Sequence, residues 1–177
     1  MLEIFNILEP FFRDNYRRIN VREYARIMNI SPPSASSLLH NLHKESILNK
    51  ENERRYIYFY SNREDAVFIA LSRIYWSIQI KRTGLIDYLQ KGLVNPLIIL
   101  FGSFSKAEIK EDSDVDIAVL TISEKRINPI NTAFLEAKLK HKIHIFNLPN
   151  SFRSNKDAKN KELISNIING HILSGAW

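Results

Sequence analysis

The chain has 177 residues and contains no cysteine. Disulfide bonds and zinc sites built from thiolates are therefore excluded, although a lack of cysteine does not by itself indicate a reducing compartment. Long apolar runs are also missing, because no stretch approaches the roughly 20 residues that a helix needs to cross a bilayer. The opening Met1-Leu2-Glu3 carries an early acid and does not resemble a secretory signal. We therefore expect a globular protein of the cytoplasm with no membrane partner.

Acidic residues are fewer than basic ones. The sequence has 19 Asp and Glu against 25 Lys and Arg, which gives a formal net charge of +6 and a pI near 9.5. Such an excess favours polyanionic partners without identifying one. The first 95 residues hold 14 basic and 10 acidic residues, and the rest hold 11 and 9, so the N-terminal half is the more basic. An apolar content of 45% is ample for ordinary cores in one or two small domains.

The stretch from Leu97 to Leu120, LIILFGSFSKAEIKEDSDVDIAVL, combines a buried strand, a turn and closely spaced carboxylates. Its first five residues form an apolar run with a β-branched centre, which is typical of a strand covered on both faces. Gly102 and Ser103 end this run. Glycine permits backbone angles that other residues resist and lets a ligand approach the chain closely, so a phosphate would fit at this turn.

A second apolar run, Ile117 to Leu120, follows the residues Ser113-Asp114-Val115-Asp116. Side chains two positions apart on a strand point to the same face, so we expect the two aspartates to project together. Neighbouring carboxylates repel each other, and a bound divalent cation removes this cost. Hard oxygen ligands of this kind suit Mg²⁺ or Mn²⁺. Taken singly, Gly-Ser occurs at many turns and Asp-x-Asp at many solvated strand edges.

Taken together, the two motifs resemble the signature of the polymerase-beta-type nucleotidyltransferase superfamily, especially its minimal single-domain members. Ser103 and Asp114 are eleven positions apart (114 − 103), as in the family's form Gly-Ser-x-x-x-Gly-(x)5-Ser-Asp-x-Asp, and Ser113 also matches that form. One departure is Ala107, where the form has glycine. We expect this alanine to do little beyond stiffening the loop. The resemblance covers about residues 85–175.

This resemblance implies roles for particular residues. Gly102, Ser103 and Ser113 would bind the nucleotide, and Asp114 and Asp116 would be catalytic residues that hold Mg²⁺ or Mn²⁺. The implied activity is transfer of a nucleoside monophosphate from a nucleoside triphosphate to an acceptor. Minimal members of the family often act on a partner toxin of the HEPN class or on small molecules, and the acceptor cannot be read from this sequence.

The family usually has a third acidic residue on the strand after Asp-x-Asp, where it helps to bind the catalytic metal. This chain has His144 at the matching place, between Ile143 and Ile145. Histidine can act as a neutral ligand or as a general base, so His144 is a candidate catalytic residue. It nevertheless removes a negative charge, and imidazole suits magnesium poorly. Loss of one strong electrostatic contact costs about 3 to 4 kcal/mol of transition-state stabilisation. Alternatively, His144 is only a strand residue beside the metal face.

Two helices followed by a hairpin are predicted between residues 21 and 60. Asn20 with glutamate three places on indicates a capping box and a helix to about Met28. Ser31-Pro32 indicates the start of a second helix that runs to about Glu45. Ile47-Leu48, a polar tip over residues 49–55 that ends in two arginines, and the apolar run over residues 56–60 then predict a β-hairpin.

This order, particularly REYARIMNISPPSASSLLHNLHKESIL, resembles the winged helix-turn-helix domains of prokaryotic regulators. In that family the second helix enters the major groove and the wing touches phosphates or the minor groove. Winged helices also serve as protein and RNA modules, and serines stand here where strong DNA binders often have arginine. The resemblance implies DNA contacts by seven residues: Ser34, Ser36, Ser37, His40, Lys44, Arg54 and Arg55.

The fold class expected for the whole chain is α+β. Residues 1–61 would form the winged helix-turn-helix, residues 62–83 a linking helix capped by Asn62, and residues 84–177 the nucleotidyltransferase-like domain, a small mixed sheet with helices on one face. The boundary is placed at Thr83-Gly84, which breaks the helix. The linking helix is rich in aromatic residues, which indicates packing in a core or in a homodimer. Further predicted elements are helices over 85–93, 131–139 and 162–173, a strand over 142–146 and a polar loop over 151–161.

Two functions are compatible with this sequence. The first is a nucleotidyltransferase with a DNA-binding winged helix. The alternative is a catalytically impaired DNA-binding transcriptional regulator or antitoxin-like protein that binds nucleotide without turnover. The intact Gly-Ser and Asp-x-Asp motifs favour the first function, whereas His144 and the winged helix favour the second.

Overall fold

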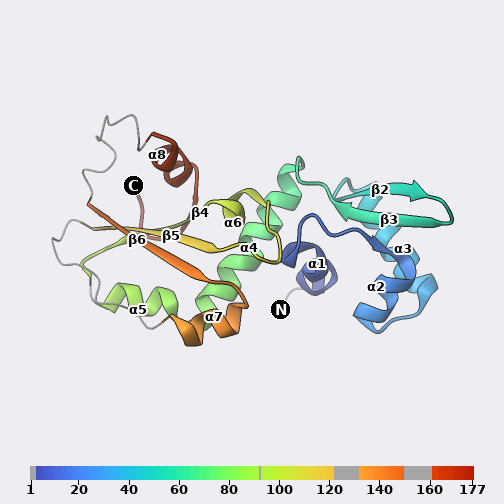
Figure 1. Ribbon diagram of the computed structural model, residues 1–177, viewed down its shortest axis with the longest axis horizontal. Helices are drawn as coiled ribbons and strands as arrows, with labels where there is room; N and C mark the ends of the chain where they lie inside the picture. The colour runs from blue at the N-terminus through green and yellow to red at the C-terminus, as the bar shows by residue number, and fades with distance from the viewer. Residues whose placement is uncertain (1–2, 92, 122–131, 150–160) are drawn as a thin grey trace. The chain divides into compact units, whose positions relative to one another are not determined.

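The computed structural model describes residues 3–91, 93–121, 132–149 and 161–177 (Figure 1). The chain divides into two compact units, Met1–Ser72 with Ala107–Glu111, and Arg73–Lys106 with Asp112–Trp177. The division falls within helix α4 (Ala66–Thr83), earlier than the boundary predicted at Thr83-Gly84. The two halves of this helix belong to different cores: the ring of Phe68 packs on Phe12 at 5.5 Å, whereas that of Trp76 packs on Phe104 at 4.7 Å.

The first unit contains the predicted pair of helices and the predicted hairpin, close to their expected bounds. Its sheet is antiparallel, with strand order β1-β3-β2. The elements are α1 (Glu3–Arg13), β1 (Ile19–Asn20), α2 (Val21–Met28), α3 (Pro32–Lys44), β2 (Leu48–Glu53) and β3 (Tyr56–Ser61).

The side chains predicted as caps do cap both helices of the pair. Asn20 Oδ1 accepts a hydrogen bond from the backbone N–H of Glu23 at 3.0 Å, and Ser31 Oγ accepts one from the N–H of Ser34 at 3.3 Å. The capping box of α2 shows only this first half, because the carboxylate of Glu23 accepts a hydrogen bond from Arg17 at 2.8 Å. Local cap chemistry therefore sets where these helices begin.

Helix α4 begins four residues later than predicted. Asp65 Oδ1 accepts a hydrogen bond from the N–H of Phe68 at 2.8 Å and caps the helix. Asn62, the predicted cap, donates its side-chain amide to the carbonyl of Ser46 at 2.8 Å instead. The aromatic side chains of α4 are buried, as expected for core packing.

A mixed four-stranded sheet forms the centre of the second unit, as predicted. Its strand order is β6-β5-β4-β7, in which β4 is antiparallel to β5 and β7, and β5 is parallel to β6. The elements after α4 are α5 (Leu85–Lys91), β4 (Leu97–Phe101), α6 (Ser103–Lys106), β5 (Val115–Thr121), α7 (Ala133–Leu139), β6 (Ile143–Pro149), α8 (Lys161–Ile168) and β7 (His171–Ser174).

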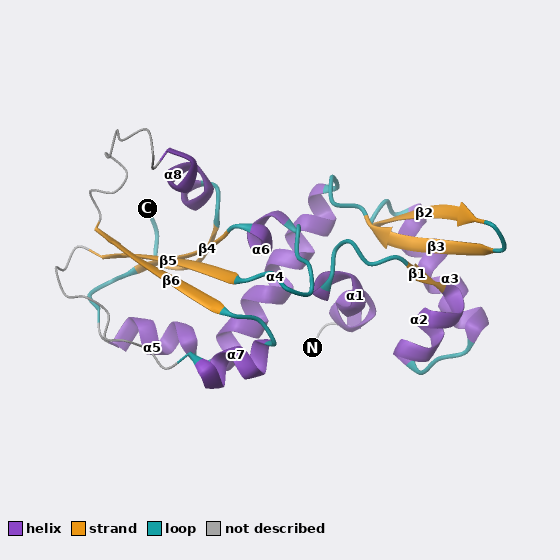
Figure 2. Ribbon diagram, viewed as in Figure 1, coloured by secondary structure: helices purple, strands orange, loops and turns teal. Residues whose placement is uncertain are grey.

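Helices lie on both faces of this sheet, whereas the sequence predicted them on one face. Ile99 and Phe101 pack on one side against Ile167 of α8. Figure 2 shows α5 and α7 on the side of the sheet away from α8. Within the described ranges, no helix combines the length and the apolar character needed to cross a membrane.

The predicted closing helix is wrong in its second half, because α8 ends at Ile168 and the chain continues as strand β7. Gly170 explains the change: a Cβ atom there would lie 2.5 Å from Cγ2 of Ile99 and 2.7 Å from the carbonyl oxygen of Leu100. Only glycine lets the chain pass this close to β4. The predicted polar loop over 151–161 lies outside the described residues except for its last position. Residue 131, the first of the helix predicted over 131–139, also lies outside them.

A buried asparagine joins two segments of the first unit. Asn15 is 1% exposed, its side-chain amide donates to the carbonyl of Phe11 at 2.7 Å, and its Oδ1 accepts from the N–H of Ile109 at 2.7 Å. The backbone N–H of Asn15 also donates to the carbonyl of Ile109 at 2.8 Å. Three hydrogen bonds in a buried place thus depend on one residue.

We expect Asn15→Ala to lower the free energy of unfolding by about 1 to 3 kcal/mol, because the buried N–H of Ile109 loses its acceptor, whereas the carbonyl of Phe11 keeps the hydroxyl of Ser61 at 3.3 Å. Urea unfolding followed by circular dichroism measures the change. Asn169→Ala is the matched control, since this exposed asparagine bonds only within its own turn and should change stability by about 0.5 kcal/mol or less. Equal stability of the two variants would show that the buried hydrogen bonds of the Asn15 side chain do not stabilise the first unit.

Candidate active site

Three neighbouring strands bring the predicted site residues to one end of the second sheet. Phe101, the last residue of β4, pairs with Asp116 on β5, and Asp116 pairs with His144 on β6. Paired residues on adjacent strands share a face, so Asp116 and His144 lie side by side just beyond the Gly102 turn. The strand register therefore assembles the candidate site from segments that are distant in sequence.

Both predicted carboxylates face the same imidazole. The Nδ1 atom of His144 lies 3.5 Å from Oδ1 of Asp116 and 4.0 Å from Oδ2 of Asp114. The side chains of Asp116, Asp114 and His144 are 26%, 37% and 52% exposed, so all three are open to a ligand. The expectation that the two aspartates project together is confirmed, and His144 lies beside them.

The turn at Gly102 packs directly on Asp116. Gly102 has φ +68°, and a Cβ atom built there would lie 2.6 Å from Oδ2 of Asp116. Ser103 begins α6, and the carbonyl of Gly102 accepts hydrogen bonds from the N–H and the hydroxyl of Ser105 at 3.2 and 2.9 Å. Glycine suits this position by its backbone angle, and a Cβ atom here would displace the carboxylate of Asp116.

Ala107 departs from the expectation that alanine only stiffens the loop. Its φ is +55°, in the left-handed region, and the residue is fully buried. An L-residue in this region carries a strain of about 1 to 2 kcal/mol that glycine would avoid. The position thus keeps the backbone conformation that suits the family's glycine.

The charges of the site act on one another. Burial is the largest influence on the pKa of Asp116 and raises it, the imidazole of His144 opposes this rise, and the charge of Asp114 adds to it. Outside the cluster, the pKa of Glu136 is lowered first by the N–H of Ile143, which donates to its carboxylate at 3.1 Å, and next by the hydroxyl of Thr132. The carboxylate of Glu136 thereby holds the first residue of β6, the strand that carries His144.

The residues present fit a hard dication through two of their three donors. Asp114 and Asp116 supply carboxylate oxygens of the type that Mg²⁺ and Mn²⁺ prefer, whereas His144 supplies a nitrogen. In the part of the chain that the structure describes, no group of three or more His, Cys, Asp or Glu residues is arranged as a metal site. The donor set is therefore a carboxylate pair, with the imidazole as its neighbour.

Sequence reasoning missed one residue that contacts this region. Nδ1 of His141 lies 2.8 Å from the carbonyl oxygen of Ser113, immediately before Asp114. The next residue, Lys142, accepts a hydrogen bond from the N–H of Val115 at 2.8 Å. No sequence motif marks His141, because its role depends on contacts with segments far away along the chain.

Three of the residues predicted to contact DNA line one groove of the first unit, with a volume of about 510 Å³. Arg22 and Tyr56, which the sequence analysis did not name, line the same groove and add a charge and a ring. The complete lining is Asn20, Val21, Arg22, Pro32, Ser36, His40, Arg55, Tyr56 and Ile57. The other four predicted residues, Ser34, Ser37, Lys44 and Arg54, lie outside this lining.

Two of the predicted DNA contacts have structural partners. The hydroxyl of Ser34 lies 2.8 Å from that of the cap residue Ser31. Nδ1 of His40 lies 2.8 Å from the carbonyl oxygen of Ser36, and its ring meets Phe59 edge-on at 5.1 Å. These contacts tie both side chains to the fold of the first unit.

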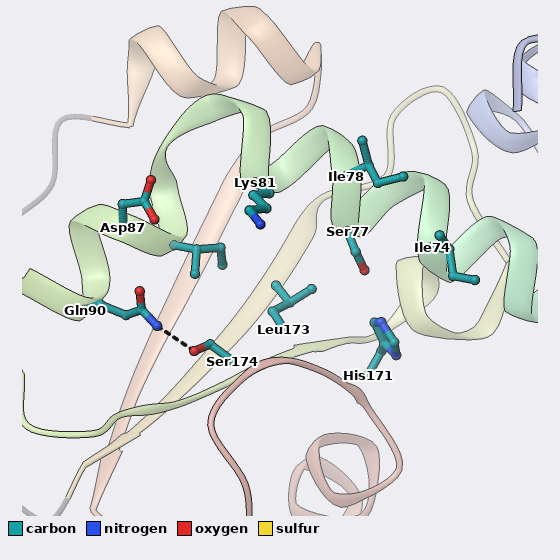
Figure 3. A pocket seen from close by; sticks show the side chains of 10 residues that line it. Ile74, Ser77, Ile78, Lys81, Asp87, Gln90, His171, Leu173 and Ser174 are labelled. Atoms are coloured by element: carbon teal, nitrogen blue, oxygen red, sulfur yellow. Dashed lines mark hydrogen bonds between the residues drawn. The ribbon is translucent and has the colours of Figure 1, made fainter. Parts of the chain in front are cut away.

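A second groove, of about 410 Å³, lies in the second unit between α4, α5 and β7 (Figure 3). Lys81 and Leu173 point into it, and Gln90 donates a hydrogen bond to Ser174 at 2.7 Å. His171 also lines this groove and pairs with Leu100, whose side chain faces away from Asp116 because neighbours on a strand alternate. The groove is thus on the other face of the sheet from the carboxylates.

Replacement of Gly102 by alanine is expected to lower the free energy of unfolding more than replacement of Gly84. Both glycines have positive φ, +68° and +83°, so each alanine carries a backbone cost of about 1 to 2 kcal/mol. Only the Cβ atom at position 102 meets a carboxylate, since nothing lies within 4 Å at position 84. The atom it meets is the end of a side chain that is 26% exposed and can move, so we expect an extra loss of about 1 kcal/mol or less. Thermal and urea unfolding measure the difference, and equal losses would show that Asp116 moves aside without cost.

A family model described as Polymerase beta, Nucleotidyltransferase matches residues 84–175, slightly more than half of the chain. This segment includes the Gly102 turn, both aspartates and His144. Neither the comparison with curated proteins nor that with solved structures gives a match. From the family match, the chain belongs to the polymerase beta nucleotidyltransferase family.

Proposed function

We propose that this chain is a metal-dependent nucleotidyltransferase that transfers a nucleoside monophosphate from a nucleoside triphosphate to a hydroxyl-bearing acceptor. The observation that carries the proposal is the meeting of Asp114, Asp116 and the Gly102 turn at one end of a sheet. The family match over the same segment supports the reaction class.

In this proposal Asp114 and Asp116 hold Mg²⁺ or Mn²⁺. The ion, when bound, neutralises the charge that develops on the transferred phosphoryl group. Gly102 and Ser103 hold the triphosphate, because a turn without a side chain at position 102 leaves backbone groups accessible. Ser113 completes the nucleotide site next to the first aspartate.

His144 takes the place of the family's third acid in this proposal. Its Nδ1 atom faces the two carboxylates, so its other ring nitrogen, Nε2, is the atom that would accept the proton of the attacking hydroxyl. A neutral base of this kind replaces the carboxylate in proton transfer but not in charge. The site therefore has less negative charge with which to hold a metal.

The alternative function is a regulator or antitoxin-like protein that binds nucleotide without turnover. The replacement of a carboxylate by His144 favours it, since imidazole is a poor ligand for magnesium. Binding of nucleotide that depends on magnesium, without release of pyrophosphate, distinguishes this function from the enzyme.

For the first unit we propose a DNA-binding winged helix-turn-helix. The order α2, α3 and hairpin supports it, and so does the groove that holds Arg22 and Arg55 between the second helix and the hairpin. Two guanidinium groups beside a polar helix suit a phosphate backbone better than base recognition.

A HEPN-type toxin as acceptor and a homodimer are further parts of the proposal for the whole chain.

Incubation with labelled nucleoside triphosphates, Mg²⁺ or Mn²⁺ and acceptors of several classes, a HEPN-class protein included, tests the enzyme. We expect the wild type to form labelled product and Asp114→Asn to form it at least about 10²-fold more slowly, because a strong electrostatic contact to the reacting phosphate is removed. Asp87→Asn is the matched control, since Asp87 lines the groove on α5 and should leave the product unchanged.

His144→Asp separates the two functions in the same assay. Product formed only by this variant would identify the natural chain as an impaired relative. Nucleotide binding without product in every variant would also favour the regulator.

The DNA proposal predicts that Arg22→Ala with Arg55→Ala weakens binding to duplex DNA about equally for all sequences. Each lost phosphate contact should reduce the slope of log affinity against log salt by about 1. Fluorescence anisotropy at about 50 to 200 mM salt measures both the affinity and its dependence on salt. Arg82→Ala with Lys91→Ala removes the same number of positive charges at exposed positions of the second unit and should alter neither. An unchanged slope in the double variant would rule out this groove as the phosphate contact.

A further inference from the structure

His141 occupies an aromatic site close to the carboxylate pair. The residue is 8% exposed, and its ring meets Trp76 at 5.3 Å and Phe104 at 5.1 Å, both edge-on with interplanar angles of 80° and 86°. Its Nδ1 atom lies 2.8 Å from the carbonyl oxygen of Ser113. A carbonyl can only accept, so Nδ1 must carry the hydrogen of this bond.

We propose that His141 is a positioning residue that fixes the Asp114–Asp116 pair relative to the Gly102–Ser103 turn. This inference rests on the proposed function and adds to it a residue outside the family motif. It assigns His141 no contact with the metal or the nucleotide.

The hydrogen bond of His141 controls the segment that carries the first aspartate. Ser113 is bonded through its carbonyl to His141, and Val115 is bonded through its N–H to the carbonyl of Lys142 at 2.8 Å. The backbone on either side of Asp114 is thus held by two consecutive residues of one segment. Because Asp114 precedes β5 and has no strand pairing of its own, these two bonds set its direction.

The ring of His141 controls the other half of the site. Phe104 is the residue after Ser103 on α6, and its ring packs on both His141 and Trp76. The three rings form one cluster at mutual distances of 4.7 to 5.3 Å. A shift of the His141 ring would therefore move α6 and the turn before it. One side chain links the phosphate turn and the acid segment.

Two variants separate the hydrogen bond from the ring. His141→Phe keeps an aromatic ring but loses the N–H donor, whereas His141→Asn keeps an N–H donor at a similar distance from the backbone but loses the ring. His43→Phe is the matched control, because Nδ1 of His43 makes the same type of bond, 2.9 Å to the carbonyl oxygen of Leu48, in the first unit. Loss of a group that orients metal ligands costs about 10- to 100-fold in affinity or activity.

The first readout is binding of a non-hydrolysable ATP analogue with Mn²⁺ by titration calorimetry, at a temperature where every variant is folded. We expect Kd to rise about 10-fold or more in His141→Phe, to recover at least partly in His141→Asn and to stay unchanged in His43→Phe. If the wild type binds the analogue and both His141 variants bind it as tightly as the wild type does, the positioning role is wrong while the proposed function survives.

Amide hydrogen exchange decides the case in which the wild type itself binds no analogue, a result that would count against the proposed function. His141→Phe should then speed exchange at residues 114–116 about 10-fold more than at residues 117–120, because only the former adjoin the Ser113 carbonyl that loses its bond to His141. A uniform change along residues 114–120 would mean that His141 contributes only to overall stability and would overturn the inference.

Discussion

The pairing of β5 between β4 and β6 is the constraint on which the site depends. Phe101, Asp116 and His144 share one cross-strand position, and this position puts two carboxylates, an imidazole and the glycine turn together. The register is fixed by burial, since the central residues of β4 and β5 are fully buried on both faces. A slip by one residue would turn every side chain of β5 to the other face and bury a carboxylate where an apolar residue now lies. Hydrophobic packing thus supplies the free energy that holds mutually repelling acids in place.

Close backbone approach is the second requirement of this sheet, and glycine meets it on two sides of β4. Gly102 leaves room for the carboxylate of Asp116, and Gly170 leaves room for Ile99 as the chain enters β7. Ala107 shows the opposite solution, because an alanine accepts the left-handed conformation and its strain is compensated by burial. The loop between the turn and the acids therefore keeps its shape without the flexibility that glycine would give.

What the sequence could predict follows from whether a signal is local. Asn20 and Ser31 cap helices through atoms three residues away, and the spacing of Asp114 and Asp116 is enough to predict that they project together, so these features were predicted correctly. Strand β7 was missed because His171 to Ser174 continues an apolar pattern that a helix would also show, and only contact with β4 decides between them. The start of α4 was misplaced because the side chain of Asn62 donates its hydrogen bond to the carbonyl of Ser46, which is distant in sequence. His141 was missed for the same reason, since its partners come from α4, α6 and the segment before β5.

For the proposed reaction, the histidine beside the acids changes the charge balance more than the geometry. A site with three carboxylates carries three negative charges and can offset most of the charge of two dications. Here Asp114 and Asp116 carry two, which a single dication neutralises completely, and a second dication would meet uncompensated positive charge across a few ångströms. Burial already disfavours the charged form of Asp116, so the first ion relieves a cost that the second would not. In the proposed reaction, an imidazole in place of a carboxylate at position 144 would therefore favour a site in which the two aspartates hold a single ion.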